Sequence, residues 1–157
     1  MIVNACYIGK TKAEYLRTGI ALYEQRLGHY LRFETTVIPD LKNAKNFSVP
    51  EIKKREGQLI LNRLAKSDVL ILLDEGGKHY SSSAFAGWFQ KKMNQGTGRI
   101  VFQVGGAYGF DDAVYQRANE KMALSAMTFS HQMIRLLLVE QIYRAMTILN
   151  NEPYHNS

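Results

Sequence analysis

Two hydrophobic periodicities alternate along this chain. Short runs of aliphatic and β-branched residues are separated by polar segments, a pattern typical of strands buried in a sheet. These runs cover residues 2–8, 33–38, 69–73, 100–104 and 122–125. Longer segments between and after them carry apolar residues three or four positions apart, as expected for helices that bury one face. The alternation predicts an α/β domain with a mostly parallel sheet and helices on both faces.

The predicted helices have recognisable ends. Ser48 precedes an early proline, Pro50, and Ser81 begins a serine triplet, so both serines are expected to cap helices. Gly96 and Gly98 end the helix that begins after Ser81. The helical segments cover residues 11–30, 48–65, 81–95, 111–121 and 130–149. The polar, aperiodic residues 40–47 predict a loop.

The last predicted helix has too few polar positions for a helix with one solvent-exposed side. Its apolar residues are Ile134, Leu137, Leu138, Ile142, Ala145, Ile148 and Leu149, extended by Met133, Leu136, Val139, Tyr143 and Met146. Such a helix must be covered on more than one side. We expect the sheet on one face and a second copy of the chain on another, so the sequence predicts a homodimer.

Composition indicates an ordinary globular protein. The 157 residues suffice for one domain over residues 1–157, and 46% of them are hydrophobic. A single cysteine, Cys6, excludes a disulfide framework and a cysteine zinc site, and favours a cytoplasmic location. No apolar run approaches the roughly 20 residues of a membrane span, and no signal peptide is recognisable. The four histidines lack metal-binding spacing, so no metal is expected.

The charge balance indicates a class of partner. The chain has 20 Lys and Arg against 14 Asp and Glu, a net charge of +6. Residues 40–66 contain seven of the basic residues and only three acidic ones. A basic surface attracts polyanions over long range, so a nucleic acid is a candidate partner.

Candidate chemistry lies in the loops that follow the predicted strands. In parallel sheets, ligands bind outside the carboxyl ends of the strands, here after Leu73, Val104 and Leu124. The second of these loops has glycines at 105, 106 and 109, which fit either a close approach to a ligand or a tight turn alone. Their spacing is not the GxGxxG of dinucleotide sites, and no GKS or GKT phosphate loop occurs.

Two pairs of charged residues have structural as well as functional interpretations. Asp74 and Glu75 are adjacent, so their side chains are expected to point apart in a solvated turn. Glu140 and Arg144 are four residues apart in the last predicted helix. That spacing fits a helix salt bridge, or an arginine whose orientation toward a ligand is fixed by the carboxylate.

Several motifs in the last third of the chain resemble one protein family. They are the glycine turn, the pattern LSxMTFxHQMxR from Leu124, the pattern EQxYRA from Glu140 and the ending NxPYH. Looser matches begin at Gly9, Tyr23 and Glu56, so the likeness spans the chain. These residues resemble the SPOUT-class family of ribosomal RNA large subunit methyltransferase H.

The resemblance implies a trefoil-knotted α/β fold, an S-adenosyl-L-methionine cofactor and a homodimer. It also implies methylation of the ring N3 of a pseudouridine in bacterial 23S rRNA. The implied cofactor positions are Leu73, Gly105, Leu124, Ser125, Ala126, Met127, Thr128 and Phe129. These positions fall in the three loops that follow the strands, and small or apolar side chains with backbone amides suit adenine and a sulfonium group.

The resemblance also implies a set of catalytic candidates. They are His131, Glu140, Arg144, Tyr154 and His155. His155 or Glu140 would accept the imide proton, Arg144 would stabilise the imide anion, and Tyr154 would stack on or orient the base. Without a bound partner, the tail that carries Tyr154 and His155 is expected to fray.

The chain departs from the family in one feature, and several alternative functions also fit its sequence. Relatives often carry a basic residue after the terminal Tyr-His, where this chain has Asn156 and Ser157. A lysine from residues 42–54 could replace that cation. Because the chain has no room for a separate RNA-binding domain, we expect the assembled ribosome to be the substrate. The alternatives are a non-enzymatic ribosome assembly factor, a SPOUT enzyme with another RNA acceptor and, more distantly, an oxidoreductase.

Overall fold

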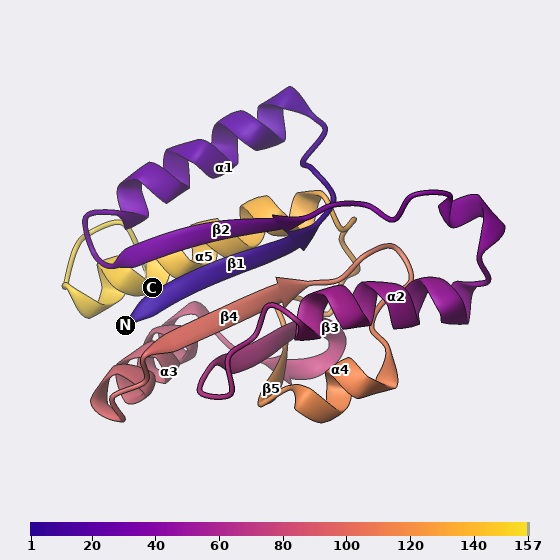
Figure 1. The fold of residues 1–157 in the computed structure, drawn as a ribbon. Coiled ribbons are helices and arrows are strands. Elements are labelled where there is room, and N and C mark those ends of the chain that lie inside the picture. Colours follow the sequence, from indigo (N-terminus) through magenta and orange to yellow (C-terminus); the bar gives the residue numbers. More distant parts are fainter. Residues whose placement is uncertain (157) are drawn as a thin grey trace.

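A five-stranded, fully parallel sheet organises the molecule, in the order β2-β1-β4-β3-β5 (Figure 1). The computed structural model describes residues 1–156, and Ser157 lies outside the described residues. The strands are β1 (Ile2–Ile8), β2 (Arg32–Ile38), β3 (Val69–His79), β4 (Arg99–Val104) and β5 (Glu120–Ala123). All five carboxyl ends therefore meet at one edge of the sheet, as the sequence predicted.

Helices cover both faces of the sheet. The five α-helices of residues 1–156 are α1 (Glu14–Leu27), α2 (Val49–Leu61), α3 (Ser82–Asn94), α4 (Asp112–Arg117) and α5 (Met133–Leu149), with a short 3₁₀ helix at Ala44–Asn46. α5 packs between α1 and α3 on one face, while α2 and α4 pack together on the other. The predicted α/β class, with helices on both faces, is confirmed.

Both faces of the sheet are buried, so side chains from the same strand enter two cores. On the α5 face, Ile71 joins an aromatic cluster that includes Phe89 and Phe102, whose ring centroids are 5.9 Å apart. On the opposite face, Leu70 and Leu72 pack in the core that contains residues of α2 and α4. Alternating residues of β3 therefore point to opposite faces, which explains the nearly continuous apolar run in its sequence.

The predicted caps are present, although the helices are shorter than their periodicity indicated. Ser48 Oγ accepts a hydrogen bond from the backbone N–H of Glu51, and Ser81 Oγ accepts one from Ala84. The first helix begins at Glu14 rather than at residue 11. The last begins at residue 133 rather than 130, because the preceding residues form a loop.

The strand β3 is longer than the sequence predicted. It continues through Asp74, Glu75 and the following glycines to His79, with an irregular register between Leu73 and Lys78. The expected solvated turn at Asp74 is therefore wrong. Extended pairing with β5 continues there because glycine at 77 leaves room for the neighbouring backbone.

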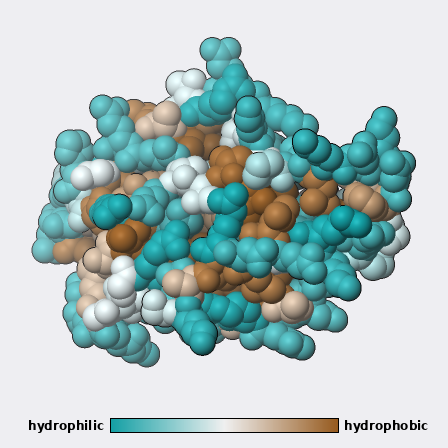
Figure 2. All heavy atoms as spheres, viewed as in Figure 1, coloured by the Kyte–Doolittle hydropathy of each residue, from teal (hydrophilic) through white to brown (hydrophobic). Residues whose placement is uncertain are grey.

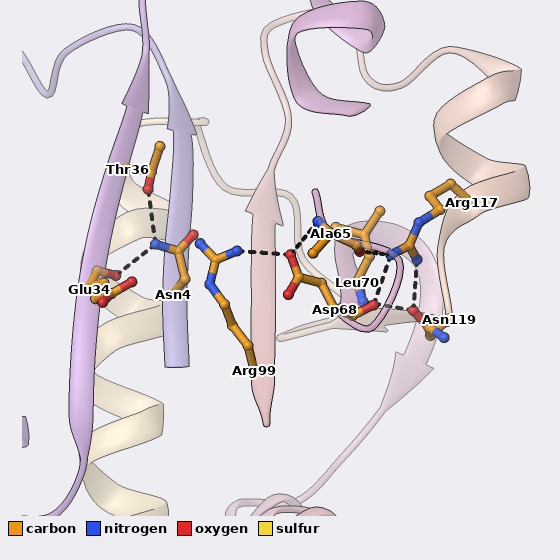
Figure 3. A network of polar contacts seen from close by, with 9 residues as sticks. All are labelled: Asn4, Glu34, Thr36, Ala65, Asp68, Leu70, Arg99, Arg117 and Asn119. Carbon is orange, nitrogen blue, oxygen red and sulfur yellow. Dashed lines mark hydrogen bonds and ion pairs between the residues drawn. The ribbon is translucent and has the colours of Figure 1, made fainter. Parts of the chain in front are cut away.

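Polar side chains at the amino ends of the strands satisfy one another (Figure 3). Asp68 Oδ2 accepts hydrogen bonds from Arg99 Nη1 at 2.8 Å and from the Ala65 N–H at 2.9 Å. Arg117 donates to the carbonyl oxygens of Ala65 and Asp68, and also to Asn119 Oδ1. This network ties the loop before β3 to the loop before β5, so that edge of the sheet is closed by its own hydrogen bonds.

The apolar last helix is mainly covered by its own chain. Leu138, Val139, Ile142, Ala145 and Met146 are buried against the sheet and the two flanking helices. Its remaining large apolar side chains are half-buried.

On the face seen in Figure 2, apolar side chains gather near the middle and hydrophilic ones surround them. None of the helices in residues 1–156 combines the length and hydropathy of a membrane span.

Gly77 offers a direct test of the close approach between β3 and β5. A Cβ at this position would lie 2.5 Å from the backbone nitrogen of Met122, a contact that side-chain rotation cannot relieve. We expect Gly77→Ala to lower the free energy of unfolding by more than about 1 kcal/mol in urea titrations. The matched control is Gly87→Ala in α3, where nothing lies within 4 Å and alanine should stabilise by up to about 1 kcal/mol. Equal effects of the two changes would contradict the close packing at Gly77.

Candidate active site

A cavity of about 510 Å³ lies at the carboxyl edge of the sheet. Three segments form it: the end of β3 with Asp74 and Glu75, the glycine turn after β4, and the loop that joins β5 to α5. The three loops predicted to hold the site are thus brought together. The volume is in the range of small-molecule and cofactor sites.

Most of the sequence-predicted cofactor residues line this cavity. They are Leu73, Gly105, Leu124, Ser125, Met127, Thr128 and Phe129. Ala126 is exposed and is not among the lining residues. Of the catalytic candidates, His131 lines the cavity and the other four do not. The cavity therefore unites the cofactor candidates and separates them from the tail.

The cavity wall combines apolar side chains with the backbone of the glycine turn. Gly105 faces the ring of Phe110, whose Cζ would lie 3.2 Å from a Cβ at that position. Gly109 has φ of 80°, a left-handed conformation that favours glycine. Ser125 Oγ accepts a hydrogen bond from the Met127 N–H and so shapes the third loop. Apolar walls with backbone groups between them fit the adenosine part of S-adenosyl-L-methionine.

Asp74 belongs to the cavity wall rather than to a solvated turn. Its Oδ2 accepts a short hydrogen bond from the hydroxyl of Tyr115, and its Oδ1 accepts one from the Gly76 N–H at 2.8 Å. Burial and this contact together raise the pKa of Tyr115 to about 12. Asp74 is therefore held in place by α4. The spacing of Asp74 and Tyr115 in the sequence does not predict this hydrogen bond.

A buried arginine joins the cavity loop to the first strand. The Arg135 side chain is fully buried and stacks on the Tyr7 ring at 4.8 Å. Its guanidinium donates to the carbonyl oxygens of Ile8 at 2.7 Å, Gly9 at 2.9 Å and His131 at 3.0 Å. Five guanidinium N–H groups suit several carbonyl acceptors at once. Arg135 therefore fixes where α5 begins relative to the end of β1.

The remaining catalytic candidates form one hydrogen-bonded cluster. Glu140 Oε1 accepts from Arg144 Nη2 at 2.6 Å and from the Tyr154 hydroxyl at 3.0 Å. Arg144 Nη1 lies 3.3 Å from Nδ1 of His155, and its guanidinium lies 4.7 Å from the centroid of the Tyr154 ring. The pKa of Arg144 is raised, mainly by its hydrogen bonds to Glu140. The predicted salt bridge thus exists, and it is part of a larger polar group that we call the tail cluster.

The tail that carries this cluster is docked rather than frayed. Tyr154 packs edge-on against Tyr143 with centroids 4.8 Å apart, and its hydroxyl lies 3.3 Å from that of Tyr23. Glu152 accepts a hydrogen bond from the Tyr30 hydroxyl. The expectation that an unbound tail frays is wrong because aromatic side chains of α1 and α5 hold it. Tyr143 belongs to the apolar positions predicted for the last helix, and this was the signal in the sequence for a contact with the tail.

The cavity meets the first turn of α5, whereas the tail cluster lies along the middle and second half of the helix. Ile134 is the last residue in the chain that lines the cavity, and Arg144 comes ten residues later. A rise of 1.5 Å per residue places Glu140 about 9 Å and Arg144 about 15 Å from Ile134 along the helix axis. Within one chain, no residue of the tail cluster lines the cavity.

Comparison with known proteins agrees with this architecture. A family model described as "Predicted SPOUT methyltransferase" matches residues 1–155. The chain belongs to the SPOUT methyltransferase family.

Three full-length relatives of this SPOUT protein carry the name "Ribosomal RNA large subunit methyltransferase H". The protein of that name from Parabacteroides distasonis is 56% identical over 156 residues, 99% of each chain. That from Christiangramia forsetii is 51% identical over 156 residues, again 99% of each chain. That from Cytophaga hutchinsonii is 55% identical over 149 residues, 95% of this chain and 96% of the relative.

Two further findings concern possible metal ligands and the single thiol of this SPOUT chain. Within residues 1–156, no group of three or more His, Cys, Asp or Glu side chains could hold a metal ion. The thiol of Cys6 is buried in the sheet, and burial raises its pKa to about 11. A thiol with so high a pKa is a poor nucleophile at neutral pH.

The buried guanidinium allows a test of what holds the SPOUT cavity together. We expect Arg135→Met to lower the free energy of unfolding by about 2–4 kcal/mol, because it leaves buried carbonyl oxygens without donors. Chemical denaturation followed by circular dichroism measures this loss. Arg32→Met is the control: that side chain is 71% exposed in its pair with Glu34, so its loss should stay within about 0.5 kcal/mol. An Arg135 variant as stable as the control would show that the contacts of Arg135 contribute little.

Proposed function

We propose that this protein is an S-adenosyl-L-methionine-dependent methyltransferase acting on large-subunit ribosomal RNA. The observation that carries the proposal is the cavity, in which seven of the eight expected cofactor residues converge from three separate loops. Family membership and the shared name of the full-length relatives agree with it. A non-enzymatic assembly factor would need no such cavity.

The finer proposal is that the methyl acceptor is the ring N3 of a pseudouridine in 23S rRNA of the assembled ribosome, in the cytoplasm. The net charge of +6 supports binding to RNA phosphate groups. Lys42 and Lys45 are exposed on the loop after β2, at the same edge of the sheet as the cavity. They are candidates to replace the basic residue that the tail lacks.

In this proposal the cavity binds the cofactor, and the tail cluster binds the acceptor base. Bound S-adenosyl-L-methionine supplies an electrophilic methyl group on a sulfonium. The cavity holds the adenosine part, and the protein must align the acceptor nitrogen at about 3–3.5 Å from the methyl carbon. Tyr154 would stack on the base, and Arg144 would stabilise negative charge that develops on the imide.

Proton removal from the acceptor nitrogen is assigned to His155 in preference to Glu140. Glu140 already accepts four hydrogen bonds, from Arg144, Tyr154 and Gln141. Among residues 1–156, the one polar contact of His155 is that of Arg144 Nη1 with its Nδ1 at 3.3 Å. That nitrogen would take the proton when Arg144 turns toward the imide charge. His131, at the cavity wall, would orient the cofactor or the base.

We further propose that the protein acts as a homodimer in which the tail cluster of one protomer completes the cavity of its partner. A separation of about 9–15 Å along α5 places the two halves of the chemistry apart within one chain. Met127 is 76% exposed and Phe129 is 39% exposed at the cavity mouth, with half-buried Leu137 nearby on α5. Exposed apolar side chains at this place favour contact with a second chain.

The proposal includes the trefoil knot of the SPOUT family. The loop from β5 to α5 lies against the loops that follow β3 and β4, because all three line one cavity. Arg135 then fixes the start of α5 at the end of β1. This course of the chain across the carboxyl edge supports a threaded connection, an exception to ordinary topology.

Methyl transfer to defined ribosomes tests the function. Ribosomes from cells that lack this protein are incubated with it and labelled S-adenosyl-L-methionine, and the rRNA is mapped by mass spectrometry. We expect one methyl group on a pseudouridine of the large subunit. Methyl on another RNA would overturn the acceptor, and no transfer together with no cofactor binding would favour the assembly factor.

Mixed dimers test whether the site is shared between protomers. Thr128→Trp fills the cavity from an exposed lining position, and His155→Ala removes a tail group. Each variant alone should be inactive. In a statistical mixture, half of the dimers are mixed and each of these has one intact shared site, so about a quarter of the wild-type activity should return. If no activity returns although mixed dimers are detected by mass spectrometry, each tail serves its own cavity.

A further inference from the structure

A second hollow of about 270 Å³ adjoins the proposed cofactor cavity. It lies between the loop after β2, the helix α2 and the glycine turn. Gly106, Ala107 and His131 line both spaces, so the two share a wall. Two carboxylates, Asp40 and Glu56, also line this hollow, which we call the acidic hollow.

Glu56 is an unusual residue for a helix surface. Its side chain is on the buried side of α2, and the residue is 8% exposed. Its carboxylate makes no hydrogen bond or ion pair within residues 1–156. Oε2 lies 2.8 Å from the place that a Cβ on Gly106 would take, so the carboxylate faces the glycine turn. A side chain at position 106 would displace the carboxylate from this place.

No counter-charge within residues 1–156 pairs with Glu56. Burial raises the pKa of Glu56, and the nearby charge of Asp40 raises it further. Lys45 also lines the acidic hollow, but no ion pair joins it to either carboxylate. Glu56 is mostly buried, but its carboxylate oxygens open into the hollow, where a carboxylate without a counter-charge attracts a cation. The negative charge and the free carboxylate oxygens of the acidic hollow therefore suit a bound cation.

The kind of cation follows from what surrounds it. A metal ion would need more ligands, and the described residues offer no cluster of three. RNA phosphate would be repelled by two carboxylates. An organic ammonium group needs only hydrogen-bond acceptors and a negative field. The methionine part of the proposed cofactor carries such a group, and the adjoining cavity would place it near the shared wall.

We propose that Glu56, assisted by Asp40, binds the α-ammonium group of the cofactor's methionine moiety. This assignment rests on the proposed use of S-adenosyl-L-methionine and extends the cofactor site into the acidic hollow. Asp74 is less suited to the task because it is already held by Tyr115 and the Gly76 N–H. Glu56 therefore selects for a cofactor with a free amino group and against adenosine nucleotides, whose phosphates it repels.

Calorimetric binding of two ligands tests this assignment without relying on turnover. S-adenosylhomocysteine keeps the ammonium group, whereas 5′-S-(3-carboxypropyl)-5′-thioadenosine is the same molecule without it. We expect the wild-type protein to bind the first about 10- to 100-fold more tightly. Glu56→Gln should weaken binding of S-adenosylhomocysteine by a similar factor and change that of the deaminated ligand by less than about twofold.

One control variant, one variant of the assisting carboxylate and one stability measurement separate recognition from folding. Glu51→Gln changes an exposed carboxylate on the same helix and should leave both affinities unchanged. Asp40→Asn should have a smaller effect in the same direction as Glu56→Gln. The Tm of Glu56→Gln should equal or exceed that of the wild type, because the change removes an unpaired buried charge.

The results that would contradict the role of Glu56 differ from those that would contradict the proposed function. Equal loss of affinity for both ligands, or no loss for either, would overturn the role of Glu56 while leaving the cofactor site in place. A wild-type protein that binds neither S-adenosylhomocysteine nor S-adenosyl-L-methionine would overturn the proposed function as well.

Discussion

Burial of the parallel sheet on both faces is the constraint on which the rest of the molecule depends. Because helices cover each face, the strands are apolar and their polar groups can reach a ligand only at the two ends of the sheet. At the amino end, Asp68, Arg99 and Arg117 satisfy one another. At the carboxyl end, glycines and short loops leave a cavity. The position of the candidate active site is thus a consequence of how the sheet is covered.

The carboxyl edge is kept open by a few contacts between residues that are distant in sequence. Arg135 joins the start of α5 to the end of β1, and Tyr115 of α4 holds Asp74 at the cavity wall. These contacts fix loops that would otherwise be free to collapse into the space. Glu56 differs from them because it has no partner among the described residues, and an unpaired carboxylate that opens into a hollow is a feature expected at binding sites rather than in cores.

The fold was largely predictable because its signals are local. Hydrophobic periodicity located all five strands, and their parallel order directed attention to the loops after Leu73, Val104 and Leu124. What periodicity could not give depends on tertiary contacts. The extension of β3 follows from pairing with β5, and the burial of Arg135 follows from carbonyl groups more than 120 residues away. The roles of the tail residues came from family resemblance, since spacing alone fits an ordinary helix salt bridge.

The central claim is that the cavity at the carboxyl edge of the sheet is the cofactor site. Its most direct test is a titration of ¹⁵N-labelled protein with S-adenosylhomocysteine, followed by the backbone amide signals in two-dimensional NMR spectra. The account predicts the largest shifts in residues 73–75, 104–110 and 122–131, which form the cavity wall. Shifts concentrated at the amino ends of the strands, around Asp68 and Arg117, or no shifts at saturating ligand, would contradict it.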